Sequence, residues 1–169
     1  AWSKREKRSI KSCEIMNTIE QFNVRVYGLL VNEKFEVLLT DEFRIGMNMT
    51  KFPGGGLIYG ESTIDCLKRE CVEELGQEVE IIDHFYTTDF FQKSLITSNN
   101  RQLISIYYLI KTKEKIKFKT VNTPFSFTQN VDGPQCFRFK KISELNEDEM
   151  TFPIDKKVVK LLKMKYQSI

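Results

Sequence analysis

Three consecutive glycines behind a proline, at Gly54–Gly56, are the feature that most constrains how this chain folds. Such a run marks a backbone that turns sharply and leaves room close to the main chain. A helix is expected after it, because Ser62 with Asp65 three residues later resembles a capping box. The following residues lack Gly and Pro up to Gly76, where the helix should end. The sequence therefore predicts a tight turn followed by a helix with both ends marked.

The expected helix has an apolar face and an acidic face. Apolar residues follow steps of three and four and predict a buried stripe, made of Ile64, Leu67, Cys71 and Leu75. Glutamates repeat these steps on another face, at Glu70, Glu73 and Glu74. Carboxylates this close repel one another, so a cation that prefers hard oxygen ligands, chiefly Mg²⁺ or Mn²⁺, would stabilise them. Taken alone, an acidic face is more often simply a solvated helix surface.

The joint spacing of the glycines, Glu61 and the helix glutamates is more specific. The segment GGLIYGESTIDCLKRECVEELGQ, residues 55–77, closely resembles the Nudix box. That pattern is Gly, five residues, Glu, seven residues, Arg-Glu, an aliphatic residue, any residue, Glu-Glu, any residue, Gly and an aliphatic residue. All seven polar and glycine positions match: Gly55, Glu61, Arg69, Glu70, Glu73, Glu74 and Gly76. Cys71 and Gln77 stand at the two aliphatic places, and neither change touches a carboxylate.

The resemblance to the Nudix hydrolase superfamily implies an α/β fold, an α/β/α sandwich around a mixed β-sheet. By analogy, the ligands of a Mg²⁺ ion, with Mn²⁺ as the alternative, would be Glu70, Glu73, Glu74 and the backbone carbonyl of Gly54. Arg69 would hold a metal-binding carboxylate in place, with help from Glu61. The metal would neutralise a diphosphate and lower the pKa of the attacking water, so no nucleophilic side chain is required.

The resemblance leaves the general base open between a box glutamate, such as Glu70, and an acidic residue in a later loop. Asp132 is the one acidic residue between Lys119 and Lys141, which makes it the candidate outside the box. Its Asp-Gly-Pro context is also ordinary turn chemistry, and a purely structural role is the simpler interpretation.

The remaining segments predict strands and a second helix. The runs at 23–31 and 35–40 are separated by a short polar turn and indicate a hairpin. Strand-like segments follow at 78–91, 101–112 and 134–141, and Pro153 opens an amphipathic helix. This order predicts one mixed α/β domain.

Size, charge and cysteine usage narrow the class of protein. The 169 residues suit one globular domain, and a net charge of +3 gives no reason to expect a nucleic-acid partner. No apolar run approaches the roughly 20 residues that cross a bilayer, so no membrane partner is expected. Four cysteines without a CxxC pair favour reduced thiols and a cytoplasmic location.

Two basic segments have both a structural and a functional interpretation. Residues 1–15 are polar and basic and precede Met16, so we expect a flexible leader or tag at 1–15 and a single Nudix hydrolase domain at 16–169. An arm that binds nucleic acid is the alternative. Alternating lysines are expected on one face of a strand, where they would protect an edge or, alternatively, attract a polyphosphate or RNA: Lys111, Lys113, Lys115, Lys117 and Lys119.

These observations favour a Mg²⁺-dependent Nudix pyrophosphohydrolase. It would cleave a phosphoanhydride bond of a small nucleotide, either a nucleoside triphosphate or a nucleoside diphosphate linked to another moiety. The resemblance also allows a homodimer. The alternative is a Nudix-fold module that senses a ligand and regulates without hydrolysis.

Removal of residues 1–15 tests the boundary at Met16. The shortened chain should keep the activity and melting temperature of the longer one, because the removed segment lacks the apolar periodicity that joins a core. Circular dichroism melting and size-exclusion chromatography would check this. A loss of folding, or a change in oligomer size, would show instead that the leader is part of the structure.

Overall fold

The computed structural model describes residues 21–95, 100–127 and 133–167. The predicted leader at 1–15 and Asp132 lie outside the described residues. None of the described helices is long and apolar enough to span a membrane.

The described residues form seven strands, two α-helices and one 3-10 helix. In chain order they are β1 (Gln21–Leu30), β2 (Glu36–Arg44), β3 (Met47–Lys51), β4 (Gly54–Gly56), α2 (Thr63–Leu75), β5 (Val79–Thr87), β6 (Arg101–Thr112), β7 (Gln135–Lys141), η1 (Glu147–Glu149) and α3 (Pro153–Tyr166).

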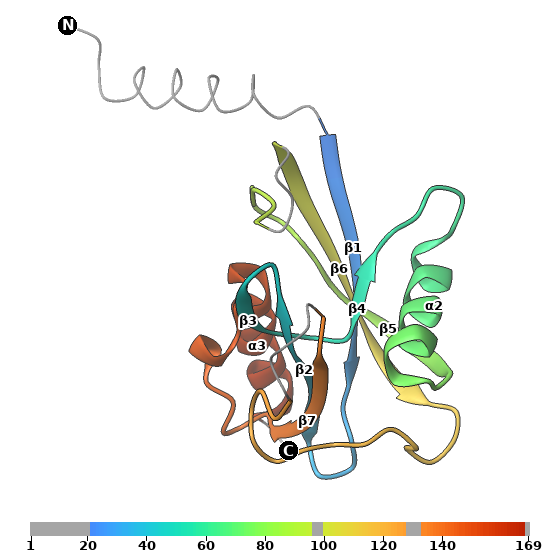
Figure 1. The fold of residues 1–169 in the computed structure, drawn as a ribbon, viewed down its shortest axis with the longest axis vertical. Coiled ribbons are helices and arrows are strands. Elements are labelled where there is room, and N and C mark those ends of the chain that lie inside the picture. The colour runs from blue at the N-terminus through green and yellow to red at the C-terminus, as the bar shows by residue number, and fades with distance from the viewer. Residues whose placement is uncertain (1–20, 96–99, 128–132, 168–169) are drawn as a thin grey trace, which may run out of the picture.

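The strands make two sheets that lie between the two α-helices (Figure 1). One sheet has the order β4-β1-β6-β5 and is mixed, because β1 and β6 run parallel whereas the other pairs are antiparallel. The other sheet, β3-β2-β7, is antiparallel. Helix α2 packs on one apolar cluster and α3 on another. This arrangement confirms the predicted α/β/α sandwich.

The predicted hairpin of the first two strands is wrong in one respect. A tight turn does join them, and the Asn32 side chain accepts hydrogen bonds from the backbone N–H groups of Lys34 and Glu36. Beyond the bridge between Val31 and Val37, however, β1 and β2 belong to different sheets. Both strands are apolar on both faces, and each therefore lies at the centre of its own sheet, between two partner strands.

Helix α2 has the predicted caps. The Ser62 hydroxyl accepts a hydrogen bond from the backbone N–H of Asp65, and Gly76 ends the helix in the left-handed conformation. Its buried stripe differs from the prediction at one position, because Ile64 is exposed and Cys66 takes the buried place instead. The helix is therefore rotated slightly from the face that simple periodicity indicates.

The alternating lysines do not share a strand face. Strand β6 ends at Thr112, and the chain then leaves the sheet. The buried side chain of Gln77 explains this, since its amide donates to the backbone carbonyls of Glu114 and Lys115 and accepts from the N–H of Lys117. The unusual glutamine at the end of the box thus holds a loop against the helix exit.

Replacing Gln77 by Leu, the kind of residue the box pattern has there, should destabilise this chain. Leucine would remove three hydrogen bonds that hold the loop at residues 114, 115 and 117, each worth about 0.5–1.5 kcal/mol. Denaturant unfolding of Q77L would measure the loss. The matched variant Q167L changes an exposed glutamine and should leave the free energy of unfolding near the wild-type value. Equal stability of Q77L and wild type would contradict the assigned role.

Candidate metal and phosphate site

The glycine strand β4 lets the helix α2 approach the mixed sheet closely. Strand β4 pairs with β1, and a Cβ atom on Gly54 would lie 2.2 Å from the carbonyl oxygen of Val26. A Cβ atom on Gly55 would lie 2.4 Å from the carboxylate of Glu70. Both distances are too short for any side chain, so the glycines are what permits the acidic face of α2 to rest on β4.

Arg69 binds three carboxylates of the site. Its Nε and Nη2 donate to the two oxygens of Glu61 at 3.1 and 2.8 Å, which is a bidentate pair. Its Nη1 donates to Glu70 at 2.9 Å and to Glu73 at 3.2 Å. Its Nη2 also donates to the carbonyl of Gly56 at 3.0 Å. One guanidinium therefore connects three acidic side chains to β4.

The charge states of Glu61 and Arg69 follow from this pairing. The hydrogen bond from Arg69, with a second from the backbone N–H of Ile58, lowers the pKa of Glu61 to about 2. The same carboxylate raises the pKa of Arg69 above its ordinary value. Glu61 therefore stays ionised and fixed, which suits a residue that positions Arg69 rather than one that exchanges protons.

Glu74 lies at the buried end of the acidic face and faces Lys51. Its Oε1 is 3.0 Å from the Lys51 Nζ, and its Oε2 accepts from the backbone N–H of Gly54 at 2.9 Å. Burial raises the pKa of Glu74, which Lys51 opposes. Burial alone would lower the pKa of Lys51, but the carboxylates of Glu74 and Glu42 raise it. We conclude that Lys51 is a buried ammonium among acidic groups.

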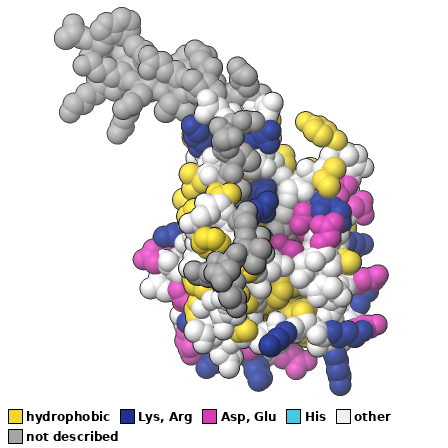
Figure 2. All heavy atoms as spheres, in the orientation of Figure 1, with side chains coloured by type: hydrophobic (Ala, Val, Ile, Leu, Met, Phe, Trp, Pro, Cys, Tyr) yellow, Lys and Arg dark blue, Asp and Glu magenta, His cyan; other side chains and the backbone are white. Residues whose placement is uncertain are grey.

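The side chains present suit a divalent cation in their chemistry but are held apart. Carboxylate and carbonyl oxygens are the ligands that Mg²⁺ prefers. Within the described ranges, no three acidic, His or Cys side chains form a ready ligand group. Protein cations explain the separation: Arg69 holds Glu70 and Glu73, whereas Lys51 holds Glu74 and the Gly54 carbonyl. Figure 2 shows acidic and basic side chains side by side over α2.

Arg25 is a site residue that the sequence did not reveal. It lies on β1, in register with Gly56 of β4, and its Nε donates to the Tyr27 hydroxyl at 2.6 Å. Its Nη1 lies 3.9 Å from the position of a Cβ atom on Gly56. The apolar run around Arg25 predicts a strand but gives no reason for a guanidinium. The structure places this positive charge beside the glycine strand.

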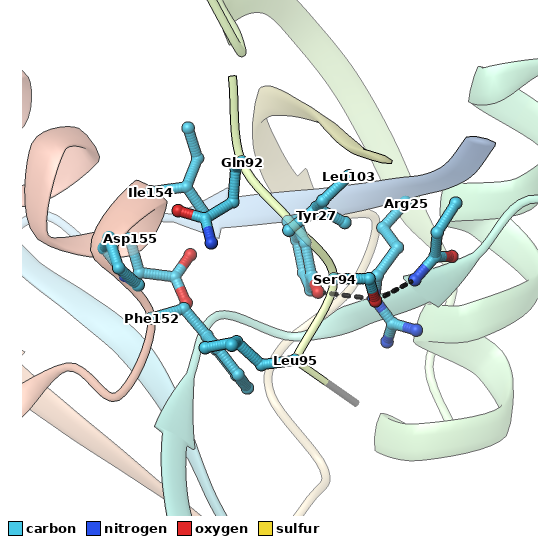
Figure 3. Close-up of a pocket in the computed structure, with 11 residues that line it drawn as sticks. Arg25, Tyr27, Gln92, Ser94, Leu95, Leu103, Phe152, Ile154 and Asp155 are labelled. Carbon is cyan, nitrogen blue, oxygen red and sulfur yellow. Dashed lines mark hydrogen bonds between the residues drawn. The ribbon is translucent and has the colours of Figure 1, made fainter. Parts of the chain in front are cut away.

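A narrow cavity is lined by Arg25 and Tyr27 of β1 together with residues of α3 (Figure 3). Its volume is about 10 Å³, which is room for about one water molecule. Asp155 of α3 lines it, fully buried, with Oδ1 accepting from the Tyr107 hydroxyl at 2.7 Å. Its Oδ2 has no hydrogen-bond partner among the described residues. Burial raises the pKa of Asp155 to about 7.

A larger open cleft runs along the outer side of α2. It has a volume of about 380 Å³ and includes Arg69 and Glu73, with Lys68 and Lys113 among the residues that line it. Lys113 is paired there with Glu78 at 2.6 Å. The cleft has room for a small ligand next to the exposed end of the acidic face.

The pH dependence of stability tests the buried acid. An unfolded Asp titrates near pH 3.9, so between about pH 4 and 7 the folded chain binds more protons at Asp155 than the unfolded chain does. The free energy of unfolding should therefore fall as the pH rises through this window. The variant D155N keeps an acceptor for Tyr107 and removes the titration, so its melting temperature should change less between pH 5 and 8.

Calorimetric melting of both proteins at these two pH values would measure the difference. The variant D148N removes an exposed carboxylate and should keep the wild-type slope in this range. Identical slopes for wild type and D155N would contradict the assignment.

Comparison with known proteins places these features in a family. The chain is similar to a NUDIX hydrolase from Nitrosomonas europaea, with a TM-score of 0.61, 18% identity, and coverage of 86% of this chain and 90% of that chain. A MutT protein from Methanosarcina mazei Go1 has a TM-score of 0.61, 16% identity and coverage of 86% and 96%. An ADP-ribose pyrophosphatase from Streptococcus suis has a TM-score of 0.55, 17% identity and coverage of 86% and 90%.

At these identities the structural likeness shows the fold, and it confirms the Nudix fold expected from the box. No curated protein matches the chain. The family model of the NUDIX domain matches residues 21–160, a range that includes both sheets and the box helix α2. The chain therefore belongs to the NUDIX domain family.

Proposed function

We propose that this protein is a pyrophosphohydrolase that depends on Mg²⁺, or alternatively Mn²⁺, and cleaves a phosphoanhydride bond of a small nucleotide. The NUDIX family includes hydrolases with this type of substrate, such as the ADP-ribose pyrophosphatase that the chain resembles in fold. The observation that carries the proposal is that all four box carboxylates are present next to the glycine strand: Arg69 holds Glu61, Glu70 and Glu73, and Glu74 accepts from the N–H of Gly54.

The residues that would hold the metal are Glu70, Glu73, Glu74 and the carbonyl of Gly54. When bound, Mg²⁺ supplies neutralisation of the diphosphate and a lower pKa for the attacking water. Arg69 orients Glu70 and Glu73, and Glu61 orients Arg69 through its bidentate pair. Removal of Glu61 would therefore act indirectly, through the position of Arg69.

The general base is a second part of the proposal. Glu70 lies against Gly55, and one of its carboxylate oxygens, Oε1, accepts from Arg69. It could accept a proton from water with its other oxygen. Asp132 remains the candidate outside the box.

Arg25 supports a phosphorylated substrate. Its guanidinium lies beside Gly56, and the charge of Glu70 is one of the influences that raise its pKa, so it offers a fixed positive charge next to the glycine strand. Arginine binds phosphate oxygens with two parallel hydrogen bonds. We therefore propose that Arg25 contacts the diphosphate of the nucleotide.

The domain bounds, cellular location and partners of the enzyme form part of the same proposal. We propose one hydrolase domain at 16–169, a cytoplasmic location, no nucleic-acid partner, and a homodimer as the oligomer to test. The three cysteines within the described residues, Cys66, Cys71 and Cys136, are free and buried, which agrees with a reducing compartment.

A nucleotide screen tests the proposal against the alternative of a ligand-sensing module. Nucleoside triphosphates, nucleotide sugars and dinucleotides would be incubated with the protein and Mg²⁺ or Mn²⁺, and the release of phosphate, diphosphate or nucleoside monophosphate would be measured. Hydrolysis of one class names the substrate. Binding of a nucleotide, seen as a rise in melting temperature, without any hydrolysis would favour the sensing module instead.

The variants E73Q and E74Q test the metal ligands. Each should lower kcat by at least about 100-fold, because the loss of an anionic ligand weakens stabilisation of charge in the transition state. Circular dichroism should show a folded protein in both, since Glu73 is exposed and Lys51 keeps Glu42 as a charged partner when Glu74 is changed. The matched variant E144Q changes an exposed glutamate away from α2 and should keep full activity. Near-normal turnover in both E73Q and E74Q would end the metal-site interpretation.

A further inference from the structure

The ammonium group of Lys51 donates hydrogen bonds to oxygen atoms that the proposed function assigns to the metal. Its Nζ donates to the carbonyl of Gly54 at 3.1 Å and to Glu74 Oε1 at 3.0 Å. The side chains are nearly closed to solvent, with exposed fractions of 4% for Lys51 and 13% for Glu74. A protein cation thus occupies the buried half of the oxygen set.

A divalent ion bound to these oxygens would lie close to this ammonium. Mg²⁺ binds its ligands at about 2.0–2.1 Å and tolerates little distortion. An ammonium within hydrogen-bond distance of the same oxygens would lie only a few ångströms from the metal, where like charges repel strongly in a shielded site. Lys51 therefore opposes the binding of a metal to Gly54 and Glu74 for as long as it stays on these oxygens.

Glu42 offers Lys51 a second carboxylate partner. Its Oε2 is 3.5 Å from the Lys51 Nζ, and its side chain has an exposed fraction of 10%. Thr40 of β2 is in register with Lys51 of β3, so Glu42, two residues further along β2, projects on the same sheet face. A small rotation of the lysine stem can exchange one carboxylate for the other and leave no buried charge unpaired.

We propose that Lys51 is a resident cation of the metal site, which competes with the divalent ion for Gly54 and Glu74 and moves to Glu42 when that ion binds. The proposal rests on the proposed function for the identity of the metal ligands. Lys51 sets the affinity for the metal, because each binding event must displace it. It also keeps Glu74 paired whenever the divalent ion is absent.

Titration with Mn²⁺ alone, followed by calorimetry, tests the competition. K51M should bind Mn²⁺ at least about tenfold more tightly than wild type, because the competitor and its repulsion are removed. K165M removes the same charge from an exposed position at the end of α3 and should remain within about twofold of wild type. Unchanged or weaker Mn²⁺ binding by K51M would overturn the proposal.

The role of Glu42 has its own test in a double-mutant cycle. E42Q should weaken Mn²⁺ binding about threefold or more in the wild-type background, because the displaced lysine loses its second partner. In the K51M background the same change should have a clearly smaller effect. An equal effect in both backgrounds would show that Glu42 acts only as a nearby charge, and the exchange would be wrong.

Two further measurements keep the test decisive if K51M does not fold. K51Q keeps a hydrogen-bond donor of similar length without the charge and should also tighten Mn²⁺ binding. In wild type labelled with ¹⁵N-lysine, the protected ammonium signal of Lys51 should shift or disappear as Mg²⁺ is added. A signal that stays unchanged while Mg²⁺ binds would overturn the proposal.

Nucleotide hydrolysis by the same wild-type samples separates this inference from the proposed function. Hydrolysis together with unchanged Mn²⁺ affinity in K51M and K51Q would overturn the exchange and leave the enzyme assignment intact. Tighter Mn²⁺ binding by both variants, without hydrolysis of any nucleotide by wild type, would support the exchange and remove the assignment as a hydrolase.

Discussion

The close contact between the acidic face of α2 and the glycine strand β4 is the constraint on which the site depends. Because Gly55 has no side chain, the carboxylate of Glu70 can occupy the space where a Cβ atom would be. Arg69 then reaches both the backbone of β4 and the neighbouring carboxylates. If a larger residue replaced Gly55, the helix would have to move outward, and all of these contacts would change together.

Local signals in the sequence were sufficient for the elements that carry their own boundaries. Ser62 and Gly76 mark the ends of α2, and strand β6 has the bounds that its apolar run predicts. The partition into two sheets could not be predicted in this way, because it depends on which distant strands β1 and β2 meet on their outer sides. The short strands β3 and β4 were also missed, since β4 consists of glycines and carries no side-chain pattern.

The site shows the same division between local and distant information. The family resemblance predicted that Arg69 would hold a metal-binding carboxylate with help from Glu61, and in the structure Arg69 donates to Glu61, eight residues away. No pattern connected Lys51 with Glu74, which lies 23 residues further along the chain on another element. Arg25 likewise belongs to the site only because the pairing of β1 with β4 places it beside Gly56. Charges on strands acquire partners through the topology of the sheets, and a single sequence does not contain that topology explicitly.

The two-residue link between β3 and β4 constrains the length of chain in the site. Lys51 ends β3 in one sheet and Gly54 begins β4 in the other, so only Phe52 and Pro53 lie between these two strands. The Phe52 ring is fully buried and meets Tyr107 edge-on, and the Pro53 carbonyl accepts from the N–H of Gly28. This link has a fixed length of chain anchored at both ends. An inserted or deleted residue would therefore shift Lys51 away from the Gly54 carbonyl and Glu74, even with every side chain of the site unchanged.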